Sequence, residues 1–184
     1  MIKVYEFLAD GFEDIEGLAP VDVLRRGGIE IQTVSVTGSE YVQTSHGVTV
    51  CADILFDDAR FDDATMLLLP GGMPGSATLD AHEGLREVIM AHASRGGYIG
   101  AICAAPLVPG RLGLLRGRRA TCYPGFEKYL DGAEYTAERV TVDGPFITGN
   151  GPGAALPYAL RLLALLAGED KASEVASGMG VTDF

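Results

Sequence analysis

The chain has 184 residues, which is enough for one compact domain with a hydrophobic core. Its 14 basic and 25 acidic residues give a formal net charge of −11, so nucleic acids and anionic membranes are poor candidates as partners. Three cysteines cannot all pair with one another, and their spacing matches no zinc or Cys-x-x-Cys pattern. We therefore expect reduced thiols, no metal and a cytoplasmic location.

Apolar runs typical of β-strands alternate along the chain with stretches of helical periodicity. The patterns predict strands at 2–8, 29–36, 66–69, 98–102, 120–122, 139–142 and 146–148, and a hairpin made of 41–44 and 48–51. They predict helices from 15 to a stop at Gly27-Gly28, at 83–95, from 104 onward, at 157–167 and at 171–177. Such alternation predicts an α/β fold with a mainly parallel, doubly wound sheet, in a single domain over residues 1–184.

Cys103 stands where the predicted strand 98–102 ends and a helix opens. Ligands of open α/β sheets bind beyond the carboxyl ends of the strands, and Cys103 is a strong nucleophile at that edge. Unsatisfied N–H groups at a helix start stabilise a thiolate, and a sharp strand-to-helix turn presents the sulfur outward. Free cysteines are also often inert buried residues. Position alone favours neither interpretation.

Glu16 lies among Ile15, Leu18 and Ala19 and can therefore share the helix face that is turned toward the sheet. A buried carboxylate needs a partner or a proton, and a nearby thiol would share one proton with it. The alternative is a solvated first-turn glutamate, like Glu13 and Asp14 beside it, and the pattern alone favours this alternative.

Two glycine-rich segments, Gly71-Gly72 and 149–153, also follow predicted strands. Their backbone N–H groups could bind an oxyanion, although ordinary turn geometry explains such glycines equally well. Neither segment is a Walker loop or a GxGxxG fingerprint, so no nucleotide cofactor is expected.

Five stretches, in order along nearly the whole chain, resemble the ThiJ/PfpI superfamily: EDIEGLAPVDVLRRGG, VQTSHGVTVCAD, LLLPGGMPG, GAICAAP and TGNGPGAA. The resemblance is strongest to the branch that contains the parkinsonism-associated protein deglycase and its bacterial relatives. It implies a flavodoxin-like three-layer α/β/α sandwich that is usually a homodimer and needs no cofactor. It places the reactive cysteine at Cys103, the proton-sharing carboxylate at Glu16 and the oxyanion-binding amides at Gly72 and Ala104. Cys51 matches a cysteine near the family's dimer interface, although the role of a small buried apolar residue is the favoured interpretation.

Three departures from the family pattern restrict the chemistry. Tyr123 stands where deglycase-like members often carry a histidine, and a phenol of pKa about 10 is no base near neutral pH. His46 replaces an arginine, which weakens any anion contact at that turn. Ala104 follows the cysteine where the protease-like branch has a histidine, and no histidine follows His92, so peptidase and glutamine amidotransferase activities are not expected.

The resemblance implies a cysteine-dependent glyoxalase or protein deglycase that acts on methylglyoxal-like aldehydes in stress protection. Tyr123, His46 and Gly71 are further candidates for substrate contact. The alternative is a stress-protective redox sensor whose Cys103 oxidises to sulfinic acid without efficient turnover. The partner is then a small aldehyde in the first case and an oxidant in the second, and the sequence does not separate the two.

Overall fold

The computed structural model describes residues 2–182. The strands are β1 (Lys3–Leu8), β2 (Glu30–Ser35), β3 (Tyr41–Gln43), β4 (Thr49–Cys51), β5 (Ile54–Leu55), β6 (Met66–Leu69), β7 (Tyr98–Ile102), β8 (Arg119–Ala120), β9 (Glu134–Tyr135), β10 (Val140–Asp143) and β11 (Phe146–Gly149). The helices are α1 (Asp14–Arg26), α2 (Gly75–Ala81), α3 (Glu83–Ser94), α4 (Leu107–Arg111), α5 (Ala155–Ala167) and α6 (Glu169–Gly178), with 3-10 turns η1 (Phe56–Asp58), η2 (Glu127–Tyr129) and η3 (Pro152–Ala154).

Within residues 2–182 the main sheet has seven strands in the order β10-β11-β7-β6-β1-β2-β5. Neighbouring strands run parallel except for the β10–β11 pair at one edge. The aliphatic strand β6 lies near the centre with every residue buried, as expected for a parallel strand covered on both faces. The predicted hairpin is confirmed as the antiparallel pair β3–β4.

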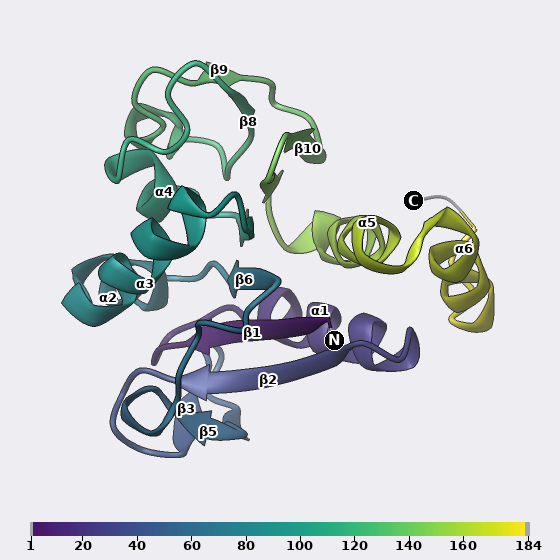
Figure 1. Cartoon of the computed structure of the whole chain (residues 1–184), viewed down its shortest axis with the longest axis horizontal. Helices are drawn as coiled ribbons and strands as arrows, with labels where there is room; N and C mark the ends of the chain where they lie inside the picture. Colours follow the sequence, from purple (N-terminus) through teal and green to yellow (C-terminus); the bar gives the residue numbers. More distant parts are fainter. Residues whose placement is uncertain (1, 183–184) are drawn as a thin grey trace.

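Helices cover both faces of the sheet (Figure 1). On one face α1 and α5 pack against a cluster that includes Val4, Leu24, Leu68, Ile102 and Tyr158, and α6 packs on α5. On the other face α2, α3 and α4 cover a second cluster built around Phe7, Leu67, Leu79, Ile89 and Val108. The predicted single-domain, three-layer α/β/α sandwich is therefore confirmed.

The structure differs from the sequence prediction in local detail. Helix α2 was not predicted, and the helix after Cys103 begins only at Leu107, because residues 103–106 form a turn. Ile15 and Leu18 point outward from α1, although their spacing predicted an inward face. Within the described part of the chain, no helix is long and apolar enough to cross a membrane.

Helix α1 is oriented by its first turn. The Glu13 side chain caps the helix by accepting a hydrogen bond from Glu16 N at 2.9 Å, and Glu13 N donates to Gly71 O at 2.9 Å. These two bonds fix the helix start against the loop after β6. Because that loop lies at the carboxyl edge of the sheet, the face that bears Glu16 turns inward and Ile15 is left exposed.

Candidate active site

Cys103 occupies a strained turn at the end of β7. Its φ is 62°, a left-handed conformation that non-glycine residues rarely adopt. Two backbone bonds hold it there: Cys103 N donates to Gly149 O at 2.8 Å, and Cys103 O accepts from Tyr123 N at 2.8 Å. The side chain retains 8% exposure, so the sulfur lies just beneath the surface. The predicted sharp turn is confirmed.

Backbone amides of Gly72 and Ala104 face the thiol. Hydrogen bonds from these two N–H groups stabilise the thiolate and act to lower the pKa of Cys103. The expected helix dipole has little part in this, because α4 has only five residues and starts four positions after the cysteine. Local amides from two different loops thus replace the helix start that the sequence predicted.

Glu16 is fully buried, which contradicts the solvated-glutamate alternative. A Cβ built on Gly71 would lie 2.3 Å from Glu16 Oε2 and 2.6 Å from Cys103 Cβ, so both side chains pack on the bare Cα of that glycine. Neither carboxyl oxygen makes a hydrogen bond of standard geometry. The Cys103 thiol and the Gly71 N–H are the polar groups that act to lower the pKa of Glu16.

Thiol and carboxyl share one proton between them near neutral pH. Burial raises the pKa of Glu16 to about 7, and burial together with Glu16 raises the pKa of Cys103 to about 12. Between these two values the pair holds a single proton. The expected thiolate with a depressed pKa is therefore wrong. The nucleophile instead forms when the shared proton resides on Glu16, which leaves the net charge of the pair unchanged.

A methyl group on Gly71 tests this packing directly. We expect Gly71→Ala to separate Glu16 from Cys103, to lower the pKa of Cys103 because Glu16 helps to raise it, and to destabilise the fold by about 1–3 kcal/mol. Gly153→Ala is the matched control in a nearby loop, since a Cβ there meets no atom within 4 Å. Reaction with an alkylating agent and thermal unfolding measure the two effects. Equal behaviour of the two variants would contradict the packing.

Tyr123 lies at the rim of this site with 47% exposure. Its backbone N–H binds Cys103 O, and a Cβ on Gly151 would lie 3.2 Å from its ring, so the tyrosine bridges Cys103 and the 149–153 segment. That segment supports Cys103 through the Gly149 carbonyl rather than through an N–H group. Tyr123 thus lies exposed beside the turn that holds Cys103.

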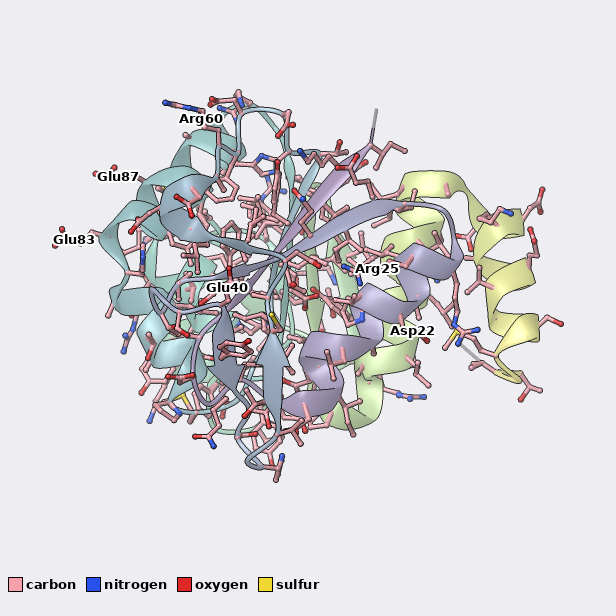
Figure 2. The ribbon with its side chains drawn as sticks, turned by 90° about the horizontal axis from the view of Figure 1, so that it is seen from below. Asp22, Arg25, Glu40, Arg60, Glu83 and Glu87 are labelled. Carbon is pink, nitrogen blue, oxygen red and sulfur yellow. The ribbon has the colours of Figure 1, made fainter. Side chains whose placement is uncertain are left out.

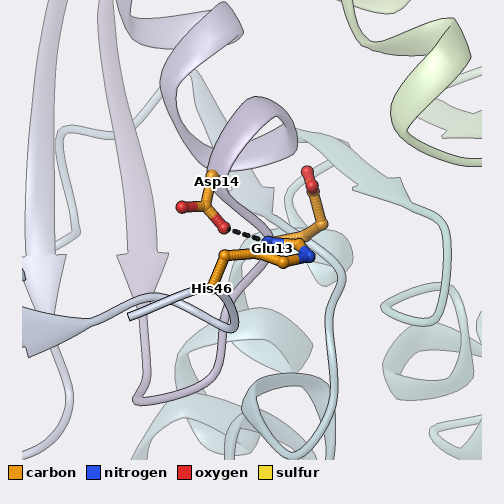
Figure 3. A group of neighbouring side chains, drawn as sticks. All are labelled: Glu13, Asp14 and His46. Carbon is orange, nitrogen blue, oxygen red and sulfur yellow. Dashed lines mark hydrogen bonds and ion pairs between the residues drawn. The ribbon is translucent and has the colours of Figure 1, made fainter. Parts of the chain in front are cut away.

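A cluster of three side chains, Glu13, Asp14 and His46, lies where α1 begins beside the β3–β4 turn (Figure 3). The three side chains can approach within 4.8 Å of one another, and His46 Nδ1 lies 2.7 Å from Asp14 Oδ2. The hydrogen bond to Asp14 raises the pKa of His46, and the bond to His46 helps to lower the pKa of Asp14. The Asp14 carboxylate thereby balances the charge of a protonated His46, so this imidazolium is already paired and does not attract an anionic substrate strongly. Glu13 is also buried by its cap, whereas the sequence suggested a solvated residue.

The other histidines and cysteines have structural positions. His82 caps α3 by accepting from Leu85 N, and buried His92 bonds Tyr98 O at 3.0 Å. Cys122 is buried, and Cys51 is exposed on β4, which contradicts the buried apolar alternative for Cys51. Glu13 is the site residue that the sequence analysis missed; a carboxylate three residues before Glu16 is the capping signal that identifies it.

The sequence matches the model of the DJ-1/PfpI family over residues 2–165. The chain belongs to this family. Protein DJ-1 homolog B of Arabidopsis thaliana is 38% identical over 176 residues, which are 95% of this chain and 40% of that protein. The chain therefore spans less than half the length of this DJ-1 relative.

Two further DJ-1 relatives match along most of their length. Glutathione-independent glyoxalase DJR-1.2 of Caenorhabditis elegans is 31% identical over 165 residues, covering 89% of this chain and 87% of that protein. The solved structure of oxidized Toxoplasma gondii DJ-1 is 33% identical, covers 100% of both chains and has a TM-score of 0.95. The flavodoxin-like arrangement expected from the sequence is confirmed by this likeness.

Proposed function

We propose that this protein is a cofactor-independent glyoxalase of the DJ-1/PfpI family, with methylglyoxal-like aldehydes as substrates and a role in stress protection. One observation carries the proposal: a cysteine at φ 62°, with the Gly72 and Ala104 amides at its sulfur, packs beside a buried carboxyl whose pKa is about 7. The DJ-1 relative named as a glutathione-independent glyoxalase supports the same chemistry.

The reaction needs only these groups. Cys103 Sγ adds to the aldehyde carbon of methylglyoxal, and the thiol proton passes through Glu16 to the carbonyl oxygen, which gives a hemithioacetal. The Gly72 and Ala104 amides stabilise negative charge on that oxygen. Glu16 as carboxylate then removes the proton from the sulfur-bearing carbon and returns it to the adjacent carbon by way of an enediol. The hydroxyl proton of the sulfur-bearing carbon passes to the ketone oxygen, which gives a lactoyl thioester. Water cleaves the resulting thioester to lactate and the free thiol.

A pKa of about 7 suits Glu16 for both roles, because acid and base forms coexist at neutral pH. Tyr123 at the rim supplies a phenol hydroxyl that can hydrogen-bond the ketone oxygen of the substrate. Protein-bound hemithioacetals and hemiaminals would enter by the same face, since Cys103 lies just below the surface. Deglycase activity is thus the extension of this mechanism to larger adducts.

Product analysis tests the proposal. The parent protein is incubated with methylglyoxal and a metal chelator, without glutathione, and lactate is followed by proton NMR. Many equivalents of lactate per protein chain support a glyoxalase. Loss of one equivalent of methylglyoxal without lactate, together with a covalent adduct at Cys103, would show a thiol that is modified but does not turn over.

A redox-sensing role is the second candidate. The solved DJ-1 relative described as oxidized favours it, and protonated Glu16 would donate a hydrogen bond to a sulfinate oxygen on Cys103. Stepwise peroxide addition with mass spectrometry tests it: a sensor accumulates two oxygen atoms at Cys103 first. Even oxidation of Cys51, Cys103 and Cys122 contradicts a tuned sensor.

We also propose that two copies of the chain associate, as the family resemblance implies. The surface that we propose for this contact is the outer face of α1 with the β3–β4 hairpin. Ile15 and Leu18 are exposed on α1, and Tyr41 and Val48 are exposed on the adjoining hairpin, which a Phe12–Thr44 bridge joins to the α1 entrance. Together they form an apolar surface across two neighbouring elements.

The association predicts a solution mass of twice 19.3 kDa for the parent. Light scattering after size exclusion should show a monomer for Ile15→Glu combined with Leu18→Glu, because two charges would enter the apolar contact. Met90→Glu is the matched control, since Met90 is an exposed apolar residue on α3, across the sheet. A monomeric parent would overturn the proposal.

A further inference from the structure

A second carboxyl group, Glu6, is buried in the core on the same face of the sheet as Glu16. Glu6 lies on the central strand β1 with 1% exposure, in register with Thr33 of β2 and Leu68 of β6. It alternates with Tyr5 and Phe7, which enter the opposite core, so its side chain lies between the sheet and the α1–α5 layer. An isolated carboxylate there would be costly, and packing gives no reason for one.

Tyr158 of α5 contributes a buried hydroxyl to the same layer. A Cβ on Gly100 of β7 would lie 2.4 Å from this hydroxyl, so the missing side chain of Gly100 makes its space. Gly100 is in register with Leu68, and Leu68 with Glu6, which sets the hydroxyl and the carboxyl at one level of the sheet. Neither Glu6 Oε2 nor the Tyr158 hydroxyl has a hydrogen-bond partner among the described residues.

Two unpartnered polar groups in one buried layer would each destabilise the fold, because each has lost its hydrogen bonds to water. Proteins meet such a cost with internal water, which needs polar partners and space in an otherwise apolar surrounding. Glu6 and Tyr158 supply the polar partners, and their remaining neighbours in this layer are largely aliphatic.

The charges around this layer connect it to the active site. Burial raises the pKa of Glu6 well above the ordinary value, opposed only in part by Arg25 at the end of α1. Arg25, labelled in Figure 2, is half exposed and already paired with Asp53 at 2.7 Å. Burial thus favours the protonated form of Glu6. Burial, Glu6 and Glu16 all raise the pKa of Tyr158, so its hydroxyl lies within the field of both carboxyl groups.

We propose that neutral Glu6 and Tyr158 hold internal water beneath Glu16, and that this hydrogen-bonded relay favours the ionised form of Glu16. The carboxylic O–H of Glu6 donates a hydrogen bond to the internal water. The Tyr158 hydroxyl donates its own hydrogen bond toward Glu16. No covalent bond changes, and both are positioning residues. The inference deepens the proposed function but does not depend on turnover, because the ionisation of Glu16 is read through Cys103.

The test is the pH profile of Cys103 alkylation by iodoacetamide. In the parent, the thiolate fraction rises as the Cys103–Glu16 pair loses its first proton near pH 7 and then reaches a plateau. Tyr158→Phe removes the hydroxyl and should move this lower inflection to higher pH by at least about 0.5. Glu6→Leu should move it in the same direction.

Two variants separate this relay from a structural effect. Glu6→Gln keeps a neutral hydrogen-bonding side chain and should leave the inflection in place, whereas loss of a charged Glu6 would move it to lower pH. Tyr5→Phe is the matched control: Tyr5 is an equally buried tyrosine on the other face of the sheet, where it bonds Asp63 at 2.9 Å. It should leave the inflection unchanged.

An unmoved inflection in Tyr158→Phe, or a downward shift in Glu6→Gln, would overturn the relay. A high-resolution crystal structure checks the water, which is expected within hydrogen-bond distance of both Glu6 Oε2 and the Tyr158 hydroxyl. A dry layer would overturn the proposal. If the protein does not turn over methylglyoxal, the alkylation profile still tests the relay. Failure of the proposed function and failure of the relay are therefore distinguishable.

Discussion

Cys103→Ala should convert methylglyoxal no faster than buffer, a loss of at least about 1000-fold relative to the parent. The substitution removes the atom that bonds the aldehyde carbon, and no other side chain at this edge can replace it: Tyr123 is a neutral phenol and Glu16 is a weak nucleophile. Lactate formation followed by NMR measures the effect. The fold should remain, because alanine leaves the local backbone and the Gly149 contact unchanged.

Cys51→Ala is the control for this experiment, since Cys51 is an exposed thiol on β4. It should retain parent activity, and circular dichroism should show all three proteins folded. Turnover by Cys103→Ala at the parent rate would remove the central residue of the proposed mechanism. Loss in both variants would point to a requirement for thiols in general.

Glu16→Gln should lower turnover about 10²–10⁴-fold while making the thiol easier to ionise. Glutamine cannot move the proton between the two substrate carbons. Burial, the Glu16 charge and its hydrogen bond together raise the pKa of Cys103 to about 12, so removal of the charge and of that bond lowers this pKa. The alkylation profile should lose its inflection near pH 7 and show one midpoint below pH 12. Activity and thiol acidity thus change in opposite senses. Unfolding would also expose the thiol and lower its pKa, so circular dichroism must show that Glu16→Gln is folded.

The same variant carries a stability signature. The pKa of Glu16 is raised on folding from 4.5 to about 7, so the folded state binds more protons than the unfolded state between these values. Stability therefore falls as pH rises through that window, by on the order of 3 kcal/mol for the parent. Glu16→Gln removes this slope and should unfold at a higher temperature than the parent at pH 8. Equal pH dependence of both proteins would contradict the buried carboxyl.

Glu16→Asp completes the series because it keeps the charge but shortens the reach. It should restore the inflection in the alkylation profile without restoring full turnover, since a carboxylate drawn back from Gly71 no longer reaches the substrate carbons. A fully active Glu16→Asp would show that the position of the carboxylate is not critical.

Several features follow from the sequence by itself. Alternating strand and helix patterns, with an unbroken aliphatic run at 66–69, determine a parallel α/β sandwich, because such strands need cover on both faces. The strand end at Ile102 likewise places Cys103 at the ligand-binding edge. Family motifs add Glu16, Gly72 and Ala104, whose amides and carboxyl the fold does bring to the sulfur.

Only the tertiary structure decided how these groups act. The sequence pattern predicted an inward Ile15 and favoured a solvated Glu16. In the structure, the Glu13 cap and the bond from Glu13 N to Gly71 O orient α1 so that Glu16 faces inward, because tertiary contacts outweigh the local pattern. Likewise, a helix start at Cys103 predicted an acidic thiol. The fold instead buries the sulfur against a carboxyl, and desolvation raises the pKa of both groups until they share one proton. The burial of these two groups depends on side chains and loops that other elements pack against them, and a local stretch of sequence does not contain this information.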